Sequence, residues 1–339
     1  MNLEPLISIC IPAYNAQGVI ETSLNSILAQ DFNDYEIIIV DDGSDPRLSL
    51  TRGALTGLNS LRVKIVRQEN GGTYSARQRA FKEAHGQYII CVDADDSLTN
   101  HNALSSIAAA LENNRYPDVL LYNAIQEDGT CCVSYSDLDS DGEIARSAVV
   151  ERFFLASGWN SMWTMAFRRN LLPPIEHSPR LLMAEDRLQK AEVFARAQSY
   201  ALLDEPIYFY RKVEGSKMNS VFEPTDFYDR IYVDCRIGEM LVELGATQAM
   251  WAYSFNRNVI ASLCELASDV KRNRGERIRL YGEFRDAAGC DEGLESLDEA
   301  FLWRDYAPLK AFKDRRWALL DVLLRGRHLI SKIKRCTNC

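Results

Sequence analysis

The chain has no long apolar run, no basic leader and no cysteine framework. Its apolar stretches all fall short of the roughly 18–20 residues that a membrane-spanning helix needs, so we expect no spanning segment. The opening residues, MNLEP, carry no basic side chain and lead into a strand-like segment, so no secretory signal is expected. Nine cysteines without an extracellular spacing favour a reduced, cytoplasmic protein.

The chain also has few histidines, carries no net positive charge and lacks the glycine pattern of a dinucleotide-binding turn. The four histidines are dispersed, which disfavours a histidine-based metal site or a catalytic triad. A net charge of −9 argues against general nucleic-acid binding. The first strand-like segment is followed by Pro-Ala-Tyr-Asn-Ala-Gln-Gly, and not by the Gly-x-Gly-x-x-Gly turn of dinucleotide-dependent oxidoreductases.

The composition that remains is that of a folded α/β protein. The 339 residues are 47% hydrophobic, enough for one large α/β domain with a smaller appendage. In the first half, short apolar runs alternate with segments of helical periodicity, which predicts a mainly parallel sheet between helices. Strand patterns stop after about residue 216. We therefore predict a domain of residues 1–215 and a helical C-terminal region of residues 216–339.

The periodicity of apolar residues places the individual elements. The expected strands are residues 6–11, 36–40, 63–66, 88–92, 119–122, 200–203 and 207–211. The expected helices are residues 17–30, 73–85, 100–113, 144–157, 186–197, 227–244, 251–270 and 309–333.

Carboxylates gather where two predicted strands end. Residues 41–44 (Asp-Asp-Gly-Ser) follow one strand, and residues 93–96 (Asp-Ala-Asp-Asp) follow another. In open α/β sheets, ligands bind outside the carboxyl ends of the strands. Asp93 and Asp95 can reach one Mg²⁺ or Mn²⁺ ion, and a sugar diphosphate would complete its shell. The alternative is that Asp95, Asp96 or Ser97 only caps a following helix.

Two further segments suit a nucleotide. Asp42 can accept hydrogen bonds from a ribose or a base, and its alternative is an ordinary Asp-Gly turn. Residues 70–77 (Asn-Gly-Gly-Thr-Tyr-Ser-Ala-Arg) open a helix, whose N-terminus favours anions, and Arg77 lies one turn inside it. The alternative there is a flexible loop followed by a surface arginine.

Taken in order, residues 9–15 (Ile-Cys-Ile-Pro-Ala-Tyr-Asn), 40–44, 70–77 and 92–96 resemble the motifs of glycosyltransferase family 2. The resemblance covers about the first 100 residues strongly and the first 215 loosely. It implies a GT-A fold, inverting chemistry, an activated-sugar donor that is usually a UDP-sugar, and a Mn²⁺ or Mg²⁺ ion. It also implies a donor half of residues 1–125 and an acceptor half of residues 126–215.

The resemblance carries roles to particular positions. Asp95 would hold the metal. Residues 183–186 (Met-Ala-Glu-Asp) resemble the family's Glu-Asp pair at a helix start, so Asp186 would be the catalytic base and Glu185 would orient the acceptor. The alternative for this pair is stabilisation of the helix dipole. The positions expected to bind the nucleotide sugar are Pro12, Tyr14, Asn15, Asp42, Arg77, Asp93, Ala94 and Arg211.

Two tryptophans resemble the family's acceptor side, and at two positions the sequence differs from the family's usual residues. An exposed Trp159 or Trp163 could stack on an acceptor sugar, although a buried aromatic is the alternative for at least one of them. Gln78 replaces the family's usual Asn, and Ala80 replaces its usual Gly. Both departures lie on the predicted helix of residues 73–85 and not at the metal.

The C-terminal end of the chain is basic. Residues 303–339 contain ten Lys and Arg against three Asp and Glu, so the rest of the chain is more acidic than the total suggests. A basic amphipathic helix here could lie on an anionic membrane surface at the inner face of the cell membrane, which suits a lipid-linked acceptor. The alternative is packing onto the domain or onto a second subunit. Cys336 and Cys339 form half a zinc signature, to which we assign no role.

These observations predict a non-processive enzyme that adds one sugar to a glycan or lipid-linked acceptor in cell-surface polysaccharide assembly. A nucleotidyltransferase on a similar sheet is one alternative. A catalytically silent sugar-nucleotide-binding or scaffold protein is another, but it would have no need of Asp186. The sugar, the linkage and the oligomeric state are not encoded in any motif that we recognise.

Overall fold

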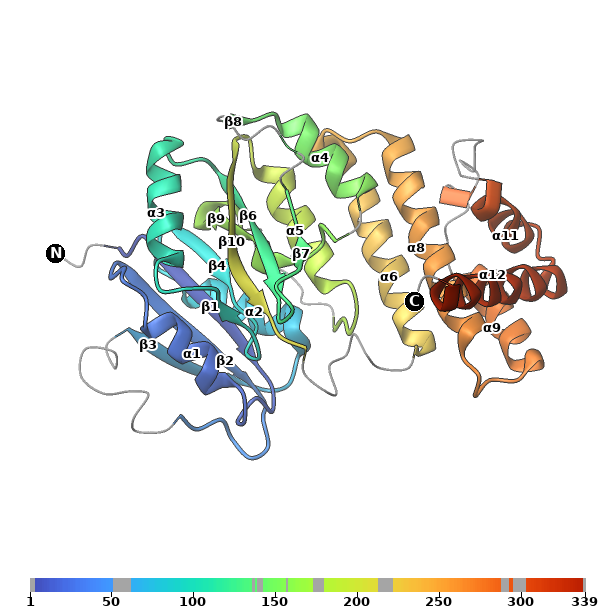
Figure 1. The fold of residues 1–339 in the computed structure, drawn as a ribbon, viewed down its shortest axis with the longest axis horizontal. Helices are drawn as coiled ribbons and strands as arrows, with labels where there is room; N and C mark the ends of the chain where they lie inside the picture. The colour runs from blue at the N-terminus through green and yellow to red at the C-terminus, as the bar shows by residue number, and fades with distance from the viewer. Residues whose placement is uncertain are drawn as a thin grey trace. The chain divides into compact units, whose positions relative to one another are not determined.

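The computed structural model describes residues 4–50, 62–135, 138, 143–156, 158–172, 180–212, 222–287, 293–294 and 303–337. The chain divides into two compact units (Figure 1). Unit 1 comprises Met1–Leu181 and Glu185–Ser216, and unit 2 comprises Leu182–Ala184 and Lys217–Cys339. The functional division into residues 1–215 and 216–339 stays a prediction.

Unit 1 is built on one ten-stranded sheet of order β3-β2-β1-β4-β9-β6-β10-β5, with β7 beside β6 and β8 beside β10. The pairs β1–β2, β1–β4, β2–β3 and β6–β10 are parallel, and β9 lies antiparallel between β4 and β6. The strands are β1 (Ile7–Ala13), β2 (Tyr35–Asp42), β3 (Val63–Gln68), β4 (Tyr88–Cys91), β5 (Ser97–Leu98), β6 (Val119–Gln126), β7 (Cys131–Val133), β8 (Glu143–Ile144), β9 (Met165–Arg168) and β10 (Tyr200–Tyr210). The expected α/β fold with a mostly parallel sheet is confirmed.

The central strands are apolar because they are covered on both faces. Every residue of β4 and nearly every residue of β2 is buried, as parallel strands between helices require. The helices of this unit are α1 (Ile20–Leu28), α2 (Gly72–Glu83), α3 (Ala103–Asn113), α4 (Arg146–Leu155) and α5 (Glu185–Arg196), with short 3₁₀ turns η2 (Met162–Thr164) and η3 (Arg169–Leu171). Helix α2 packs against β1 and β2.

The two strands expected at residues 200–203 and 207–211 form the single strand β10. Its register against β6 shifts on both sides of Pro206. Proline has no backbone N–H to donate to the ladder, so it interrupts the pairing locally without ending the strand. The proline therefore made one bulged strand resemble two.

Unit 2 is helical. Its helices are α6 (Pro224–Gly238), α7 (Leu241–Leu244), α8 (Gln248–Ser268), α9 (Arg274–Ala287), α11 (Trp303–Lys313) and α12 (Trp317–Thr337). The expected helix of residues 309–333 is wrong, because Arg315 takes a left-handed conformation (φ 57°) that separates α11 from α12. Likewise, the helix expected at 227–244 divides into α6 and α7, and α9 was not expected.

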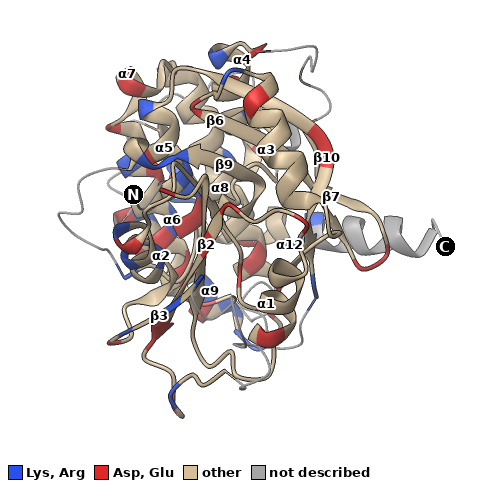
Figure 2. Ribbon diagram, turned by 90° about the vertical axis from the view of Figure 1, so that its left-hand side faces the viewer, with Lys and Arg blue, Asp and Glu red and all other residues tan. Residues whose placement is uncertain are grey.

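Helix α12 packs within unit 2 over its first part. Leu320 and Leu324 are fully buried, and Asp321 forms a buried ion pair with Arg277 (2.8 Å). The packing alternative for the basic tail therefore holds for this part of the helix. None of the described helices is both long and apolar enough to cross a membrane. Acidic and basic residues are interspersed over the described ribbon (Figure 2).

Candidate active site

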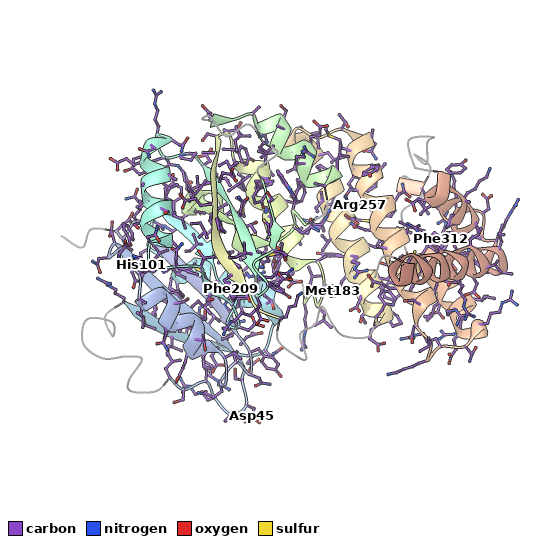
Figure 3. All side chains as sticks on the ribbon, in the orientation of Figure 1. Asp45, His101, Met183, Phe209, Arg257 and Phe312 are labelled. Atoms are coloured by element: carbon purple, nitrogen blue, oxygen red, sulfur yellow. The ribbon has the colours of Figure 1, made fainter. Side chains whose placement is uncertain are left out.

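The predicted site motifs meet at one edge of the sheet. Strand β1 is the parallel neighbour of both β2 and β4, so the carboxyl ends of all three strands lie side by side. Asp41 and Asp42 end β2, Asp93 follows β4, and Asn15 follows β1. Asn15 links two of these ends, since its backbone N–H donates to Ser44 Oγ (2.9 Å) and its Oδ1 accepts from Asp45 N (3.0 Å). Figure 3 labels Asp45 in the loop after β2.

Arg77 is the centre of this edge. Its side chain is buried, and Nη2 forms an ion pair with Asp93 Oδ1 at 2.9 Å while Nη1 forms one with Asp186 Oδ1. The second oxygen of Asp186 accepts the backbone N–H of Met162 (3.1 Å). Arg77 thus joins the predicted metal turn to the predicted base. It is not the surface arginine of the alternative interpretation.

Negative charge is crowded around this one guanidinium. Burial lowers the pKa of Arg77, but Asp186 and Asp93 outweigh it and hold the pKa well above its usual value. Burial raises the pKa of Asp93, against the influence of Arg77. Burial and the neighbouring Asp186 raise the pKa of Glu185 to about 7. Three carboxyl groups share one cation, so the site favours a further positive charge.

The carboxylates predicted to hold a metal are Asp93 and Asp95. Asp95 is half-buried and makes no hydrogen bond to any described residue, and Asp93 uses only Oδ1 for Arg77. Among the described residues, no cluster of three or more His, Cys, Asp or Glu side chains could hold a metal by itself. Two protein oxygens fit an ion such as Mg²⁺ or Mn²⁺, which keeps waters and substrate phosphate oxygens in its shell.

Asp96 does not cap a helix, which corrects the alternative considered for it. Helix α3 begins only at Ala103, and residues 97–98 form the short strand β5 instead. The buried Asp96 carboxylate binds β10, accepting Tyr208 Oη–H at Oδ2 (2.6 Å) and Arg211 N–H at Oδ1 (2.8 Å). Burial raises the pKa of Asp96 to about 8.

Tyr208 makes contacts at this edge of the sheet that the sequence did not reveal. Its hydroxyl accepts the backbone N–H of Asp93 (3.1 Å) while it donates to Asp96, so it holds both ends of the turn of residues 93–96. Trp163 stacks on the Tyr208 ring at 4.4 Å and 12°. The next residue, Phe209, is the β-ladder partner of Ser97 in β5, and its label in Figure 3 locates this end of β10. Alternating tyrosines in a strand gave no signal of this contact.

The two tryptophans predicted for acceptor stacking are buried, which corrects that expectation. Trp159 is 3% exposed and packs edge-on against Tyr135 (4.4 Å), and Trp163 is 8% exposed beneath Tyr208. The expected exposure is therefore wrong for both rings, and a role for them in acceptor binding stays a prediction. Tyr14, by contrast, is 56% exposed.

The Asp42 carboxylate holds the loop of residues 70–72, which we call the glycine loop, at the start of α2. Its Oδ1 accepts from Gly71 N (2.9 Å) and Gln68 Nε2 (2.8 Å), and its Oδ2 accepts from Gly72 N (2.9 Å). Gly72 has φ +84°, a conformation that side-chain-bearing residues rarely adopt. Arg211 keeps its Nε without a hydrogen-bond partner among the described residues. Ala94 is buried in the turn between Asp93 and Asp95, and Pro12 lies in β1.

Residues 8–135 match the family model described as Glycosyl transferase family 2. The poly(ribitol-phosphate) beta-N-acetylglucosaminyltransferase TarS of Staphylococcus aureus is 29% identical over 231 residues, which are 66% of this chain and 38% of TarS. The uncharacterized glycosyltransferase EpsJ of Bacillus subtilis is 27% identical over 225 residues, 65% of each chain. This chain therefore spans less than two thirds of either relative.

The fold is shared with a solved structure. The crystal structure of S. aureus TarS 1-349 in complex with UDP-GlcNAc superposes with a TM-score of 0.70 at 21% identity, covering 95% of this chain and 91% of that one. The likeness confirms the expected GT-A-like α/β fold with C-terminal helices.

Proposed function

We propose that the chain is an inverting, metal-dependent glycosyltransferase, because its residues 8–135 match the glycosyltransferase family 2 model. It moves one sugar from a nucleotide sugar to a hydroxyl of a glycan or lipid-linked acceptor in cell-surface polysaccharide assembly. The observation that carries the proposal is the pairing of Arg77 with both Asp93 and Asp186. A protein that binds a sugar nucleotide without catalysis has no need to hold a base such as Asp186 beside the turn of residues 93–96.

The donor end of the site is formed by the turn of residues 93–96, by the glycine loop and by the end of β10. Asp95, with Asp93, would hold Mn²⁺ or Mg²⁺, which when bound neutralises charge on the leaving diphosphate. Arg211 is anchored through its backbone to Asp96, and its guanidinium would supply positive charge at the leaving diphosphate. Tyr14, exposed after β1, is available to a nucleoside base.

The acceptor end is the start of α5. Asp186 takes the proton of the attacking hydroxyl as the new bond to the sugar's anomeric carbon forms and the bond to the nucleoside diphosphate breaks. Arg77 and the Met162 N–H each hold one oxygen of Asp186, which fixes the orientation of the carboxylate. Glu185, whose pKa is raised to about 7 by burial, lies beside it to orient the acceptor.

We expect UDP-GlcNAc to be a substrate, because the TarS structure that shares this fold was solved in complex with UDP-GlcNAc. A panel of UDP-, GDP- and dTDP-sugars with Mn²⁺ or Mg²⁺ tests this, with nucleotide release as the readout. One UDP-sugar should give metal-dependent release, and UDP with Mn²⁺ should raise the melting temperature. Chelation of the metal should abolish both effects. Neither release nor a thermal shift with any donor would contradict the proposal.

The basic end of α12 is proposed to touch an anionic membrane, which would bring the enzyme to a lipid-linked acceptor. Replacing Lys332, Lys334 and Arg335 with Glu should weaken binding to phosphatidylglycerol-containing vesicles by about 100-fold, since each basic residue near such a surface contributes about 1 kcal/mol. Co-sedimentation measures this. Leu320 and Leu324 lie in the core of unit 2, so these charge variants test the idea better than removal of the whole helix. Equal vesicle binding by wild type and variant would contradict the proposed membrane contact.

A further inference from the structure

A buried cation lies on α5 outside every role described above. Lys190 is fully buried, and its Nζ donates to Tyr135 Oη (2.8 Å), Thr164 Oγ1 (3.0 Å) and Ser161 O (3.1 Å). All three protons of the ammonium group are therefore used. The residue is one helical turn after Asp186, so both project from the same side of α5.

The partners of Lys190 form one connected network. Thr164 Oγ1 lies 2.6 Å from Tyr135 Oη, and it donates to Ser161 O at 2.9 Å. Tyr135 is tied to the sheet, because its backbone N–H donates to Asn123 Oδ1 of β6 (2.9 Å). The network thus fastens residues 161–164 to α5 on one side and to the sheet on the other.

Residues 161–164 are the segment that holds Asp186. The N–H of Met162, between Ser161 and Thr164, donates to Asp186 Oδ2, while Arg77 holds Oδ1. A shift of this turn would move the donor and let the carboxylate rotate away from Arg77. Misplacement of a reacting group by about 1 Å can cost on the order of 100-fold in rate.

An apolar side chain would fill this position at less cost than a cation. Burial lowers the pKa of Lys190 to about 7, although Asp186 acts in the opposite direction. A buried charge is expensive unless it is fully hydrogen-bonded, and replacing one by packed apolar groups is often neutral or stabilising. Stability alone therefore does not require a fully hydrogen-bonded lysine here, whereas fixing the position of residues 161–164 does.

We propose that Lys190 is a positioning residue, which holds the turn of residues 161–164 so that the Met162 N–H orients the carboxylate of Asp186. The inference rests on the proposed function, because Lys190 acts only through Asp186. Its nearest alternative is a core residue that contributes to stability alone. The two differ in whether the effect of removing Lys190 depends on Asp186.

A double-mutant cycle decides between them. Lys190→Met, Asp186→Asn and the double variant are compared with wild type for UDP release from UDP-GlcNAc with Mn²⁺, where water is the acceptor. Lys190→Met alone should lower kcat by about 10–100-fold, with UDP affinity unchanged. In the Asp186→Asn background the same change should have no further effect. An equal fold-loss in both backgrounds, or no loss in either, would overturn the inference.

Two further variants keep the result interpretable. Lys82→Met removes an exposed lysine of α2 and should match wild type in rate and melting temperature. Thr164→Val removes one partner while keeping the lysine, and should show a smaller loss of kcat that also vanishes beside Asp186→Asn. It decides the question if Lys190→Met does not fold. Wild type without UDP release refutes the proposed function, whereas an unaffected Lys190→Met refutes only this inference.

Discussion

Replacing Asp186 with Asn should lower the rate of sugar transfer by about 10²–10⁴-fold, the usual contribution of a general base. The amide has the size of the carboxylate, but it cannot take a proton from the acceptor hydroxyl. Arg77 keeps its ion pair with Asp93 in this variant, so the donor side of the site should stay in place. Affinity for UDP with Mn²⁺, measured by calorimetry, should therefore change by no more than about threefold, since binding and the chemical step are separable.

The control for this variant is Asp31→Asn. Asp31 is exposed and precedes the amino end of β2, at the opposite edge of the sheet from the site. It should behave as wild type. Parallel loss of UDP affinity and transfer in Asp186→Asn, with a lowered melting temperature, would show that the pair with Arg77 is structural and would remove Asp186 as the base.

Replacing Asp95 with Ala should abolish metal-dependent nucleotide release. A metal that stabilises a leaving diphosphate contributes several kcal/mol, and loss of about 3 kcal/mol is roughly 100-fold in rate. Asp95 makes no hydrogen bond to any described residue, so the substitution should leave the melting temperature of the protein without metal unchanged. The rate of release and its Mn²⁺ dependence are the measurements.

Chelation gives this prediction a second readout. Wild-type release should fall to the level of Asp95→Ala when the metal is removed, and the variant itself should be insensitive to the chelator. Asp31→Ala should keep the wild-type response. Nearly full activity in Asp95→Ala, with the wild-type Mn²⁺ half-saturation, would refute the metal assignment.

The burial of the two tryptophans bears on how an acceptor would bind. TarS is named for a poly(ribitol-phosphate) acceptor, and it shares 29% identity with 66% of this chain. The acceptor half predicted here, residues 126–215, contains the start of α5 and the turn of residues 161–164. Because both predicted tryptophans are buried, we propose that hydrogen bonds and charge near Glu185 contribute more to acceptor binding than aromatic stacking does.

The sequence by itself determined the fold class, the family resemblance and the edge of the sheet where the motifs lie. Apolar runs such as residues 36–40 read directly as buried strands, because strands between two helical layers need no polar face. The match over residues 8–135 confirms the resemblance first seen in the ordered motifs. Since the ends of parallel strands meet at one edge, the order of motifs was enough to predict that Asp42 and Asp93 lie at the same edge of the sheet.

The tertiary structure alone decided which side chains touch. Arg77 meets Asp186 across 109 residues of sequence, and Asp96 meets Tyr208 across 112. These contacts depend on how α5 packs against α2 and on where β10 pairs within the sheet, which no local periodicity records. Burial of Trp163 and the bonding of Lys190 depend on the same packing. Local patterns report which face of an element is apolar, whereas the partner of a buried polar group is set by elements remote in the chain.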